Sequence, residues 1–508
     1  MTDRPIPMRE APTRPNVLLV LTDDHAQWAM GCYGNREIRS PSMDYLAATG
    51  VRMANAFTPS PVCSPARASL WTGKIPSQHG IHDYLGDAVV DASGRPWMNE
   101  HLTLADRFHG ERYTTGLVGK WHLGDSQHRP AGFDYWYVKS GPLPEPEGYD
   151  SPWATTPKDL DRYNPHTLAD HAVHFLRERD RSVPFFLTIG FLATHSPWLG
   201  HPERLVDMYR KCSFDAIPSD PIHPFGSLTS EARYVTRDNR TESLAQYYAA
   251  VTEIDEQLGR ILDELDSQAI ADNTVVVYTS DHGLNTGHHG IWGKGNATHP
   301  YNMVEESIRV PMLIKAPGQT LAGQTRIEPV THCDLHLTLL ELAGITPEPA
   351  DLAELPGRSF LPLCRGDTLA DWPRTVFGEY GDLRMARSGR FKLIMRFGRG
   401  DDELFDLVDD PRETCNLATS PVHRSVLEDM RASLTSYFEH YEDPSVSGLR
   451  VRDLPPYNIE EDWRCSHDHP LYERPLWLEQ LAAGGNKRPH PGIDAPADGN
   501  WAPEKVGQ

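Results

Sequence analysis

Short apolar segments alternate with segments of helical periodicity along most of the chain, and this alternation constrains the fold most strongly. The first of them, Pro15–Thr22, is apolar at successive positions, which is typical of a strand buried on both faces. Ser40 and Pro41 then favour the start of a helix, with Ser40 as its N-cap. The series continues with helices near Thr103–Phe108, Pro165–Arg179, Ser243–Asp266 and Asp334–Ala343, and strands near Val51–Phe57, Thr114–Val118, Pro184–Phe191, Thr274–Thr279 and Arg309–Lys315. This pattern predicts an α/β fold with a large, mostly parallel central sheet.

The pattern changes after about residue 375. Short antiparallel strands are predicted there at Thr375–Tyr380, Leu383–Ala386, Phe391–Arg396 and Glu403–Asp406, with a helix near Ser425–His440. We therefore expect a polar extension over residues 1–14, a main domain over 15–374 and a smaller C-terminal α/β subdomain over 375–442. The Pro- and Trp-rich tail over residues 443–508 is predicted to form either an ordered wrapping arm or an oligomer contact.

Charge and cysteine content exclude several classes of function. The chain carries 49 Lys and Arg against 71 Asp and Glu, a net charge of −22, which argues against broad binding to nucleic acid or anionic membranes. No apolar run reaches the ~18–20 residues that would span a bilayer. The N-terminal segment lacks the apolar core of a signal peptide, and the seven cysteines form neither a disulfide framework nor a CxxC zinc pattern. These observations predict a cytoplasmic protein.

Acidic side chains follow two of the predicted strands. Asp23 and Asp24 come directly after the first strand, and Asp281 and His282 come after the strand near Thr274–Thr279. In parallel sheets ligands bind at the carboxyl ends of the strands, and adjacent carboxylates repel each other unless a cation lies between them. A solvated turn is the alternative for either pair alone, but their recurrence at two strand ends favours a divalent metal site.

A cysteine lies at the predicted start of a helix. Ser64 would cap this helix and Pro65 would be its first residue, which puts Cys63 at the helix N-terminus. The partial positive charge there favours a thiolate or a bound anion, and Arg67 lies one turn inside. A lone cysteine can also be a small buried apolar residue, but the flanking Pro65 and Arg67 favour a functional role.

Basic side chains lie in loops that also follow predicted strands. Lys120 and His122 belong to the segment GKWHLG, His195 follows the strand near Pro184–Phe191, and Lys294 lies in a glycine-rich loop. Each of these residues taken alone would be assigned to the surface. Because they converge on one edge of the sheet, they predict a cationic pocket for a tetrahedral oxyanion.

Several of these segments together resemble one enzyme family. The segment CSPAR at residues 63–67, followed by LWTGK at residues 70–74, resembles the signature of the formylglycine-dependent type I sulfatases. The paired aspartates, GKWHLG, the His195 loop and SDHG at residues 280–283 are similar to the family's other blocks, in the same chain order. The resemblance extends over about residues 15 to 420. It implies an alkaline-phosphatase-like α/β sandwich and hydrolysis of a sulfate monoester, with a catalytic main domain.

The resemblance also implies the chemistry of the site. The implied catalytic residues are Cys63, Arg67, Lys120, His122, His195 and Lys294, and the implied metal ligands are Asp23, Asp24, Cys63, Asp281 and His282. A maturase would oxidise Cys63 to formylglycine (3-oxoalanine). Its hydrate, bound to the metal and deprotonated with help from Asp281, would attack sulfur.

The remaining roles follow from the same resemblance. Arg67, Lys120 and Lys294 would hold the sulfate oxygens. His195 and Lys294 would protonate the leaving alcohol, and His122 would act as the general base that expels sulfate and restores the aldehyde.

One position departs from the commonest family pattern. Many relatives have Asn where this chain has His282, and imidazole is a less natural calcium ligand than an amide oxygen. We expect one Ca²⁺ ion, with Mn²⁺ as the alternative.

Two other functions remain as alternatives. The first is a phosphonate monoester or phosphodiester hydrolase on the same fold, although that branch typically lacks the GKWH block. The second is a non-catalytic binder of sulfated glycans, against which the intact Cys63 and Arg67 argue. The sulfated alcohol is not specified by any motif. Aromatic candidates for stacking on it are Trp28, His82, Trp198 and Trp292.

Overall fold

The computed structural model of the protein describes residues 14–85, 97–98, 100–126, 128–138, 164–196, 198, 200–220, 223, 240–298, 300–397 and 400–454. The predicted N-terminal extension, except for residue 14, and the predicted tail from residue 455 on lie outside the described residues. Among the described residues, no helix is both long enough and apolar enough to cross a membrane.

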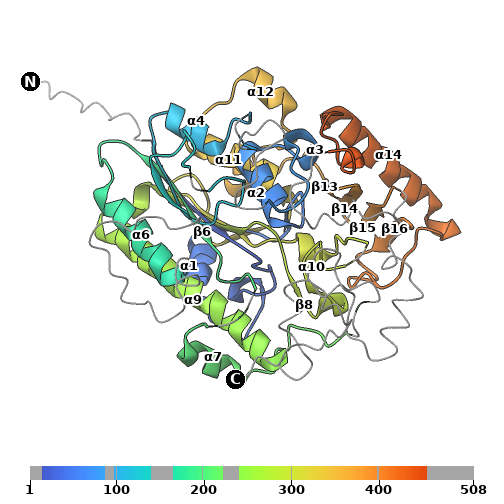
Figure 1. Cartoon of the computed structure of the whole chain (residues 1–508), viewed down its shortest axis with the longest axis horizontal. Helices are drawn as coiled ribbons and strands as arrows, with labels where there is room; N and C mark the ends of the chain where they lie inside the picture. The colour runs from blue at the N-terminus through green and yellow to red at the C-terminus, as the bar shows by residue number, and fades with distance from the viewer. Residues whose placement is uncertain are drawn as a thin grey trace, which may run out of the picture.

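A large sheet of eight strands forms the centre of the molecule (Figure 1). In spatial order its strands are β11 (Gln324–Arg326), β2 (Val51–Met53), β10 (Met312–Lys315), β7 (Thr274–Ser280), β1 (Asn16–Thr22), β6 (Phe185–Phe191), β4 (Thr114–Gly119) and β5 (Tyr135–Val138). All neighbouring pairs are parallel except those of β10, which is antiparallel to β7 and β2. The prediction of a mostly parallel sheet is therefore confirmed.

Helices cover both faces of this sheet (Figure 1). One face carries α1 (Pro41–Thr49), α6 (Pro165–Glu178), α7 (Glu203–Tyr209) and α9 (Arg240–Ser267), and the other carries α2 (Cys63–Thr72), α4 (Leu104–Gly110) and α11 (His332–Leu342). Side chains of β1 enter the two cores alternately: Leu18 and Val20 pack on the first side, and Val17 and Leu19 on the second. This burial on both faces explains why the strand is apolar at each position from Val17 to Leu21.

The segment 51–57 differs from the prediction of one strand. It forms two strands, β2 and β3 (Ala56–Phe57), and β3 pairs with β12 (Val330–Thr331) in a separate small sheet. The remaining short elements are α3 (Pro76–His79), β8 (Asn285–Thr286), β9 (Trp292–Gly293), α10 (Glu305–Ile308), α12 (Pro349–Glu354) and α13 (Leu361–Cys364).

The start of α1 also differs in its capping. Ser40 precedes the helix, but its side chain makes no capping hydrogen bond and instead accepts one from the backbone N–H of Gly31 at 3.0 Å. The Asp255 carboxylate of α9 accepts from the N–H groups of Ser42 at 3.1 Å and Met43 at 2.8 Å. The predicted cap was wrong because a residue of another helix takes that role.

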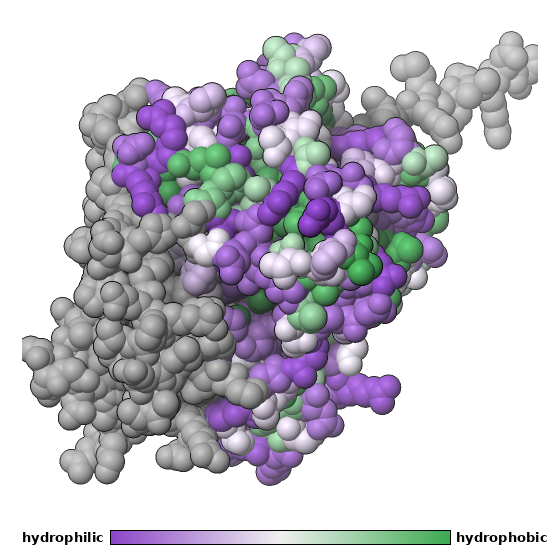
Figure 2. All heavy atoms as spheres, turned by 90° about the vertical axis from the view of Figure 1, so that its right-hand side faces the viewer, coloured by the Kyte–Doolittle hydropathy of each residue, from purple (hydrophilic) through white to green (hydrophobic). Residues whose placement is uncertain are grey.

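A second sheet of four antiparallel strands lies beside the first (Figure 1). Its strands are β13 (Thr375–Tyr380), β14 (Leu383–Ser388), β15 (Phe391–Met395) and β16 (Glu403–Asp406), and α14 (Arg424–Tyr441) covers it. The predicted strands and helix are confirmed, while the domain boundary at residue 375 stays a prediction. On the part of this side that is coloured in Figure 2, hydrophilic side chains surround small hydrophobic patches.

Candidate active site

Four adjacent strands of the main sheet, in the order β7-β1-β6-β4, end at one edge and are followed by candidate residues. β1 and β7 run side by side in register, with Thr22 opposite Ser280. The residues that follow these strands are Asp281 and His282 after β7, Asp23 and Asp24 after β1, His195 after β6, and Lys120 and His122 after β4. The topology therefore brings together groups that are up to 259 positions apart in the chain, as the strand-end argument expected.

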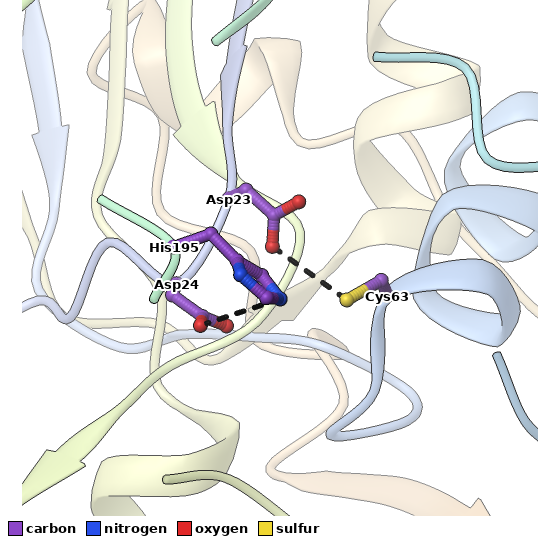
Figure 3. A group of neighbouring side chains, drawn as sticks. All are labelled: Asp23, Asp24, Cys63 and His195. Carbon is purple, nitrogen blue, oxygen red and sulfur yellow. Dashed lines mark hydrogen bonds and ion pairs between the residues drawn. The ribbon is translucent and has the colours of Figure 1, made fainter. Parts of the chain in front are cut away.

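Cys63 approaches the same edge from above the sheet, as the first residue of α2. Its thiol lies 3.6 Å from Asp23 Oδ1 (Figure 3). It also lies 3.3 Å from His282 Nε2, and the residue is 2% exposed. The predicted cap was wrong: the helix begins after Val62, and Ser64 donates instead to the His122 carbonyl at 2.7 Å. The place of Cys63 at the helix N-terminus nevertheless agrees with the prediction.

The geometry of His282 suits a cation site. Its Nδ1 lies 2.9 Å from the Gly283 carbonyl oxygen, which can only accept, so Nδ1 carries the proton. Nε2 therefore faces the carboxylates, 3.4 Å from Asp24 Oδ1 and 3.5 Å from Asp281 Oδ1, and can bind a cation once it has lost its proton. The ligand atoms of Asp23, Cys63, Asp281 and His282 all lie within 4.8 Å of one another.

A buried oxygen of the same cluster has no hydrogen bond. Within the described part of the chain, Asp24 Oδ2 is buried and lacks a hydrogen-bond partner. His195 Nε2 lies 3.9 Å from this oxygen (Figure 3). A buried carboxylate oxygen without a donor costs free energy, and a metal ion is a natural partner for it. The residues present therefore fit a divalent cation.

Three basic side chains neutralise these carboxylates. Arg67 Nε donates to Asp281 Oδ2 at 2.8 Å, Lys120 forms an ion pair with Asp23, and Lys294 Nζ donates to Asp24 Oδ1 at 2.8 Å. The basic and acidic side chains are all nearly or fully buried. Charges buried in this way must be paired, because each unpaired charge would carry a large desolvation cost.

Lys294 also lies 3.3 Å from the Cys63 sulfur. Burial raises the pKa of the Cys63 thiol, but Lys120, Lys294 and His282 outweigh burial and hold this pKa well below its usual value. The surroundings of the unmodified cysteine therefore favour its thiolate form.

The two histidines at the edge of the cluster have pKa values shifted in opposite directions. Burial and Lys294 lower the pKa of His195, but Asp24 and Asp23 raise it by more than this, so that the pKa reaches about 9. Burial and Lys120 lower the pKa of His122 below its usual value. At neutral pH the first imidazole is protonated and the second is neutral.

Sequence reasoning missed two residues that hold this site. The Thr194 hydroxyl donates to the Asp23 carbonyl, and Asn302 Nδ2 donates to the Lys294 carbonyl at 2.9 Å. Thr194 could have been suspected because it precedes His195. No motif marks Asn302, because its contact with Lys294 depends on the path of an irregular loop.

The aromatic candidates divide into two groups. Trp198 is buried and its Nε1 donates to the Thr194 carbonyl at 3.0 Å, and His82 is buried with Nε2 2.7 Å from the Val446 carbonyl. Neither of these side chains is available for stacking. Trp28 and Trp292 are half-buried and remain candidates.

Comparison with known proteins was made for both sequence and fold. A family model described as Sulfatase matches residues 15–345, and one described as N-sulphoglucosamine sulphohydrolase, C-terminal, matches residues 287–440. The chain is 26% identical to an N-acetylglucosamine-6-O-sulfatase of Bacteroides thetaiotaomicron, over 86% of this chain and 88% of that protein.

Two solved structures resemble its fold. One is a protein in complex with its substrate D-glucosamine-2-N,6-O-disulfate, with a TM-score of 0.69, 22% identity, and coverage of 84% of this chain and 98% of that chain. The other is the phosphonate monoester hydrolase of Agrobacterium radiobacter, with a TM-score of 0.67, 24% identity, and coverage of 84% and 96%.

Proposed function

The chain belongs to the sulfatase family and hydrolyses sulfate esters, and we propose that it does so with a formylglycine formed from Cys63 beside one divalent metal ion. The observation that carries this proposal is the cluster of Cys63 with Asp23, Asp281 and His282 at the ends of two adjacent strands. Once formed, the formylglycine would supply, as its hydrate, the oxygen that attacks sulfur.

The metal ion would be held by Asp23, Asp24, Asp281 and His282. The unpaired Asp24 oxygen and the position of His282 Nε2 among the carboxylates support this assignment. When bound, the ion would neutralise carboxylate charge and activate the nucleophile as a Lewis acid. We propose Ca²⁺, since carboxylate oxygens dominate the ligand set, with Mn²⁺ as the alternative because one ligand is an imidazole.

Three basic residues would bind the sulfate group. Arg67, Lys120 and Lys294 converge on the carboxylates around Cys63. Their buried positive charge can hold the sulfate oxygens and stabilise the negative charge of the transition state, and a site shielded from water strengthens that effect.

The shifted pKa values of the histidines support distinct roles. His195 keeps its proton at neutral pH, with its pKa at about 9, so it can donate to the leaving alcohol, as can Lys294. His122 is neutral, and its buried Nδ1 has no hydrogen-bond partner among the described residues, so it can take a proton as general base and expel sulfate. Burial raises the pKa of Asp281, which favours its role in deprotonating the nucleophile.

We propose a sulfated saccharide as the substrate. The curated relative acts on N-acetylglucosamine-6-O-sulfate by its name, and the structural neighbour binds a glucosamine disulfate. Trp292 supports this choice, because it is half-buried and lies two residues before Lys294, where an aromatic face could stack on a sugar ring.

We also propose a reducing, cytoplasmic location and a separate maturase. The six cysteines in the described part of the chain form no disulfide, which supports a reducing compartment. The maturase would catalyse the oxidation of Cys63 to the aldehyde.

Peptide mass spectrometry of the protein produced with a maturase tests the nucleophile. We expect conversion at Cys63, turnover of a glucosamine 6-sulfate, and loss of turnover in Cys63→Ala. Cys364→Ala removes another buried cysteine and is the matched control, which should stay active. An unconverted Cys63 in an active protein, or full activity of Cys63→Ala, would overturn the proposal.

Phosphonate monoester hydrolysis is the second candidate, because a phosphonate monoester hydrolase shares the fold. Lys120 and His122, both at the site, favour the sulfate ester. Parallel assays with an aryl sulfate and a phenyl phosphonate monoester separate the two, and faster turnover of the phosphonate would favour the second candidate.

A further inference from the structure

Lys294 lies in a loop with little regular structure. It follows β9, which pairs with β8 through two residue pairs only, Asn285 with Gly293 and Thr286 with Trp292. Its ammonium group nevertheless has to stay beside Asp24 and the Cys63 sulfur, at 2.8 Å and 3.3 Å. A short ribbon of this size is weak by itself, so other contacts must hold the lysine backbone in place.

The side chain of Asn302 makes these contacts. Its Nδ2 donates to the carbonyls of Lys294 at 2.9 Å and Gly295 at 3.2 Å, and the Asn302 backbone N–H donates to the Gly295 carbonyl at 3.0 Å. Its Oδ1 accepts from the Ser307 hydroxyl at 2.7 Å. Carbonyl oxygens only accept, so the orientation of the amide is unambiguous.

The same network reaches the residue after His282. The Ser307 hydroxyl accepts from Asn285 Nδ2 at 2.8 Å, and the Ser307 carbonyl accepts from the Gly283 N–H at 3.1 Å. Gly283 packs so closely on α10 that a Cβ at this position would overlap the Glu306 carbonyl. Lys294 and His282 are thus held by one set of buried hydrogen bonds.

The C-terminal sheet holds the segment that carries Asn302. Figure 1 shows α10 and β8 beside β15 and β16. Arg396 donates to the Tyr301 carbonyl at 2.6 Å and Lys392 to the Met303 carbonyl at 2.8 Å. The Glu413 carboxylate accepts from the backbone N–H of Glu305, two residues after Met303, at 2.7 Å.

We propose that Asn302 is a positioning residue: it holds the backbone of Lys294 in the active site and couples that lysine to the C-terminal sheet. This inference rests on the proposed role of Lys294 in binding sulfate and protonating the leaving alcohol. Asn302 is buried and its Nδ2 donates to the Lys294 and Gly295 carbonyls and to the Thr298 hydroxyl, so it acts on the reaction through Lys294. A displacement of about 1 Å of such a group can lower the rate by about a hundredfold.

A double-mutant cycle between Asn302→Ala and Lys294→Ala tests this coupling, with kcat/KM measured on aryl sulfates and corrected for conversion at Cys63. We expect Lys294→Ala to lose about 100- to 1000-fold and Asn302→Ala about 10- to 100-fold. The double variant should be no slower than Lys294→Ala within about threefold, because the asparagine has no effect once the lysine is absent.

The dependence of the rate on the leaving group is a second measurement, which a purely structural defect would not change. If Asn302 positions a proton donor, the loss in Asn302→Ala should grow as the leaving phenol becomes less acidic. Asn35→Ala, at another buried asparagine that bonds Tyr248 and two loop N–H groups, is the matched control and should show losses that are uniform across leaving groups.

Asn302→Asp provides a second variant if the alanine variant folds poorly. It keeps the size of the side chain and the acceptor for Ser307 but replaces the donor by an oxygen that faces two carbonyls. We expect a loss at least as large as in Asn302→Ala. Wild-type rates in either variant, or losses that multiply with that of Lys294→Ala, would overturn the inference. Wild-type activity of Lys294→Ala would instead overturn the proposed role of the lysine itself.

Discussion

Two residues of the active site adopt the left-handed backbone region that usually favours glycine. Asp24 has φ of 57° and His122 has φ of 60°, and such conformations cost on the order of 1–3 kcal/mol each. A hydroxyl group holds the carbonyl of each residue: Tyr247 donates to Asp24 at 3.0 Å and Ser64 donates to His122 at 2.7 Å. Strain at the scale of single residues is therefore concentrated where the proposed chemistry takes place, and long-range hydrogen bonds maintain it.

His282→Asn should change the choice of metal ion. An amide oxygen in place of the Nε2 nitrogen makes the ligand set harder, so the affinity for Ca²⁺ relative to Mn²⁺ should rise, by about tenfold or about 1.4 kcal/mol. Calorimetric titration of the metal-depleted protein with each ion measures this ratio independently of activity. His101→Asn, at a histidine outside the cluster, is the control. An unchanged ratio, or a shift toward Mn²⁺, would contradict the proposed ligand set.

The ends of individual helices are stabilised by residues of other elements. The first turn of α1 is capped by Asp255 of α9, and α10 is held by Lys392 and Glu413 of the C-terminal subdomain. Such contacts couple each helix to its neighbours, so that local sequence signals such as Ser40 do not by themselves determine where the polar groups find partners.

Asp255→Asn should change how stability depends on pH. Burial raises the pKa of Asp255 to about 6, above the unfolded value, so the folded state binds the proton more tightly. The contribution of this group to the free energy of unfolding is then largest at low pH and is lost as pH rises from about 4 to about 6. Asparagine does not titrate, so the stability of the variant relative to the wild type should rise over that window, by up to about 3 kcal/mol.

Urea unfolding of both proteins between pH 4 and 7 measures this difference. Comparison of the two proteins at each pH cancels the titration of the other carboxylates. A difference that stays flat, or that falls with pH, would show that Asp255 is not the buried carboxylate we infer.

Lys392→Met should destabilise the contact between the two sheets. The Lys392 side chain is fully buried, 3.3 Å from Glu305 Oε1 and in an ion pair with Glu413, so its removal leaves two buried carboxylates short of a cation. We expect a loss of about 3–5 kcal/mol in the free energy of unfolding. Arg390→Ala on the neighbouring turn is the control: Arg390 is 49% exposed, and its ion pairs should contribute less than about 1 kcal/mol. Equal losses in the two variants would be inconsistent with the burial of this lysine.

At the scale of the whole molecule, the net charge of the chain and the charge of the residues proposed to bind sulfate differ in sign. The chain carries −22 overall, whereas the residues proposed to hold the sulfate oxygens are the cations Arg67, Lys120 and Lys294. Their positive field is local because carboxylates and the protein interior surround it, so the net charge describes solubility and partners, not the pocket.

The predicted oligomer contact of the tail is tested by ending the chain at Leu454. We expect the full chain to form a homo-oligomer and the shortened chain a smaller species in light scattering, because residues 455–508, most of the predicted contact segment, are removed. Turnover per subunit should be unchanged, because every proposed site residue precedes residue 454. A full chain that is already monomeric would contradict the prediction.

Several features could be predicted from the sequence because they depend on neighbouring residues. The apolar run of β1, the acidic residues directly after β1 and β7, and the position of Cys63 at a helix start are local patterns, and the structure contains all of them. Strand ends of a parallel sheet lie at one edge, so these patterns also predicted which groups would meet.

Other features were decided only by the tertiary structure. The antiparallel direction of β10, the cap of α1 by Asp255, the burial of Trp198 and the contact of Asn302 with Lys294 each join segments whose distance in space depends on the path of the whole chain. The physical reason is that hydrogen bonds and burial depend on which atoms are close in space. A partner that lies far along the chain produces no pattern in the sequence around the residue that it contacts. The sequence by itself determined the sheet and the chemical groups at its edge, and tertiary packing determined how those groups are held.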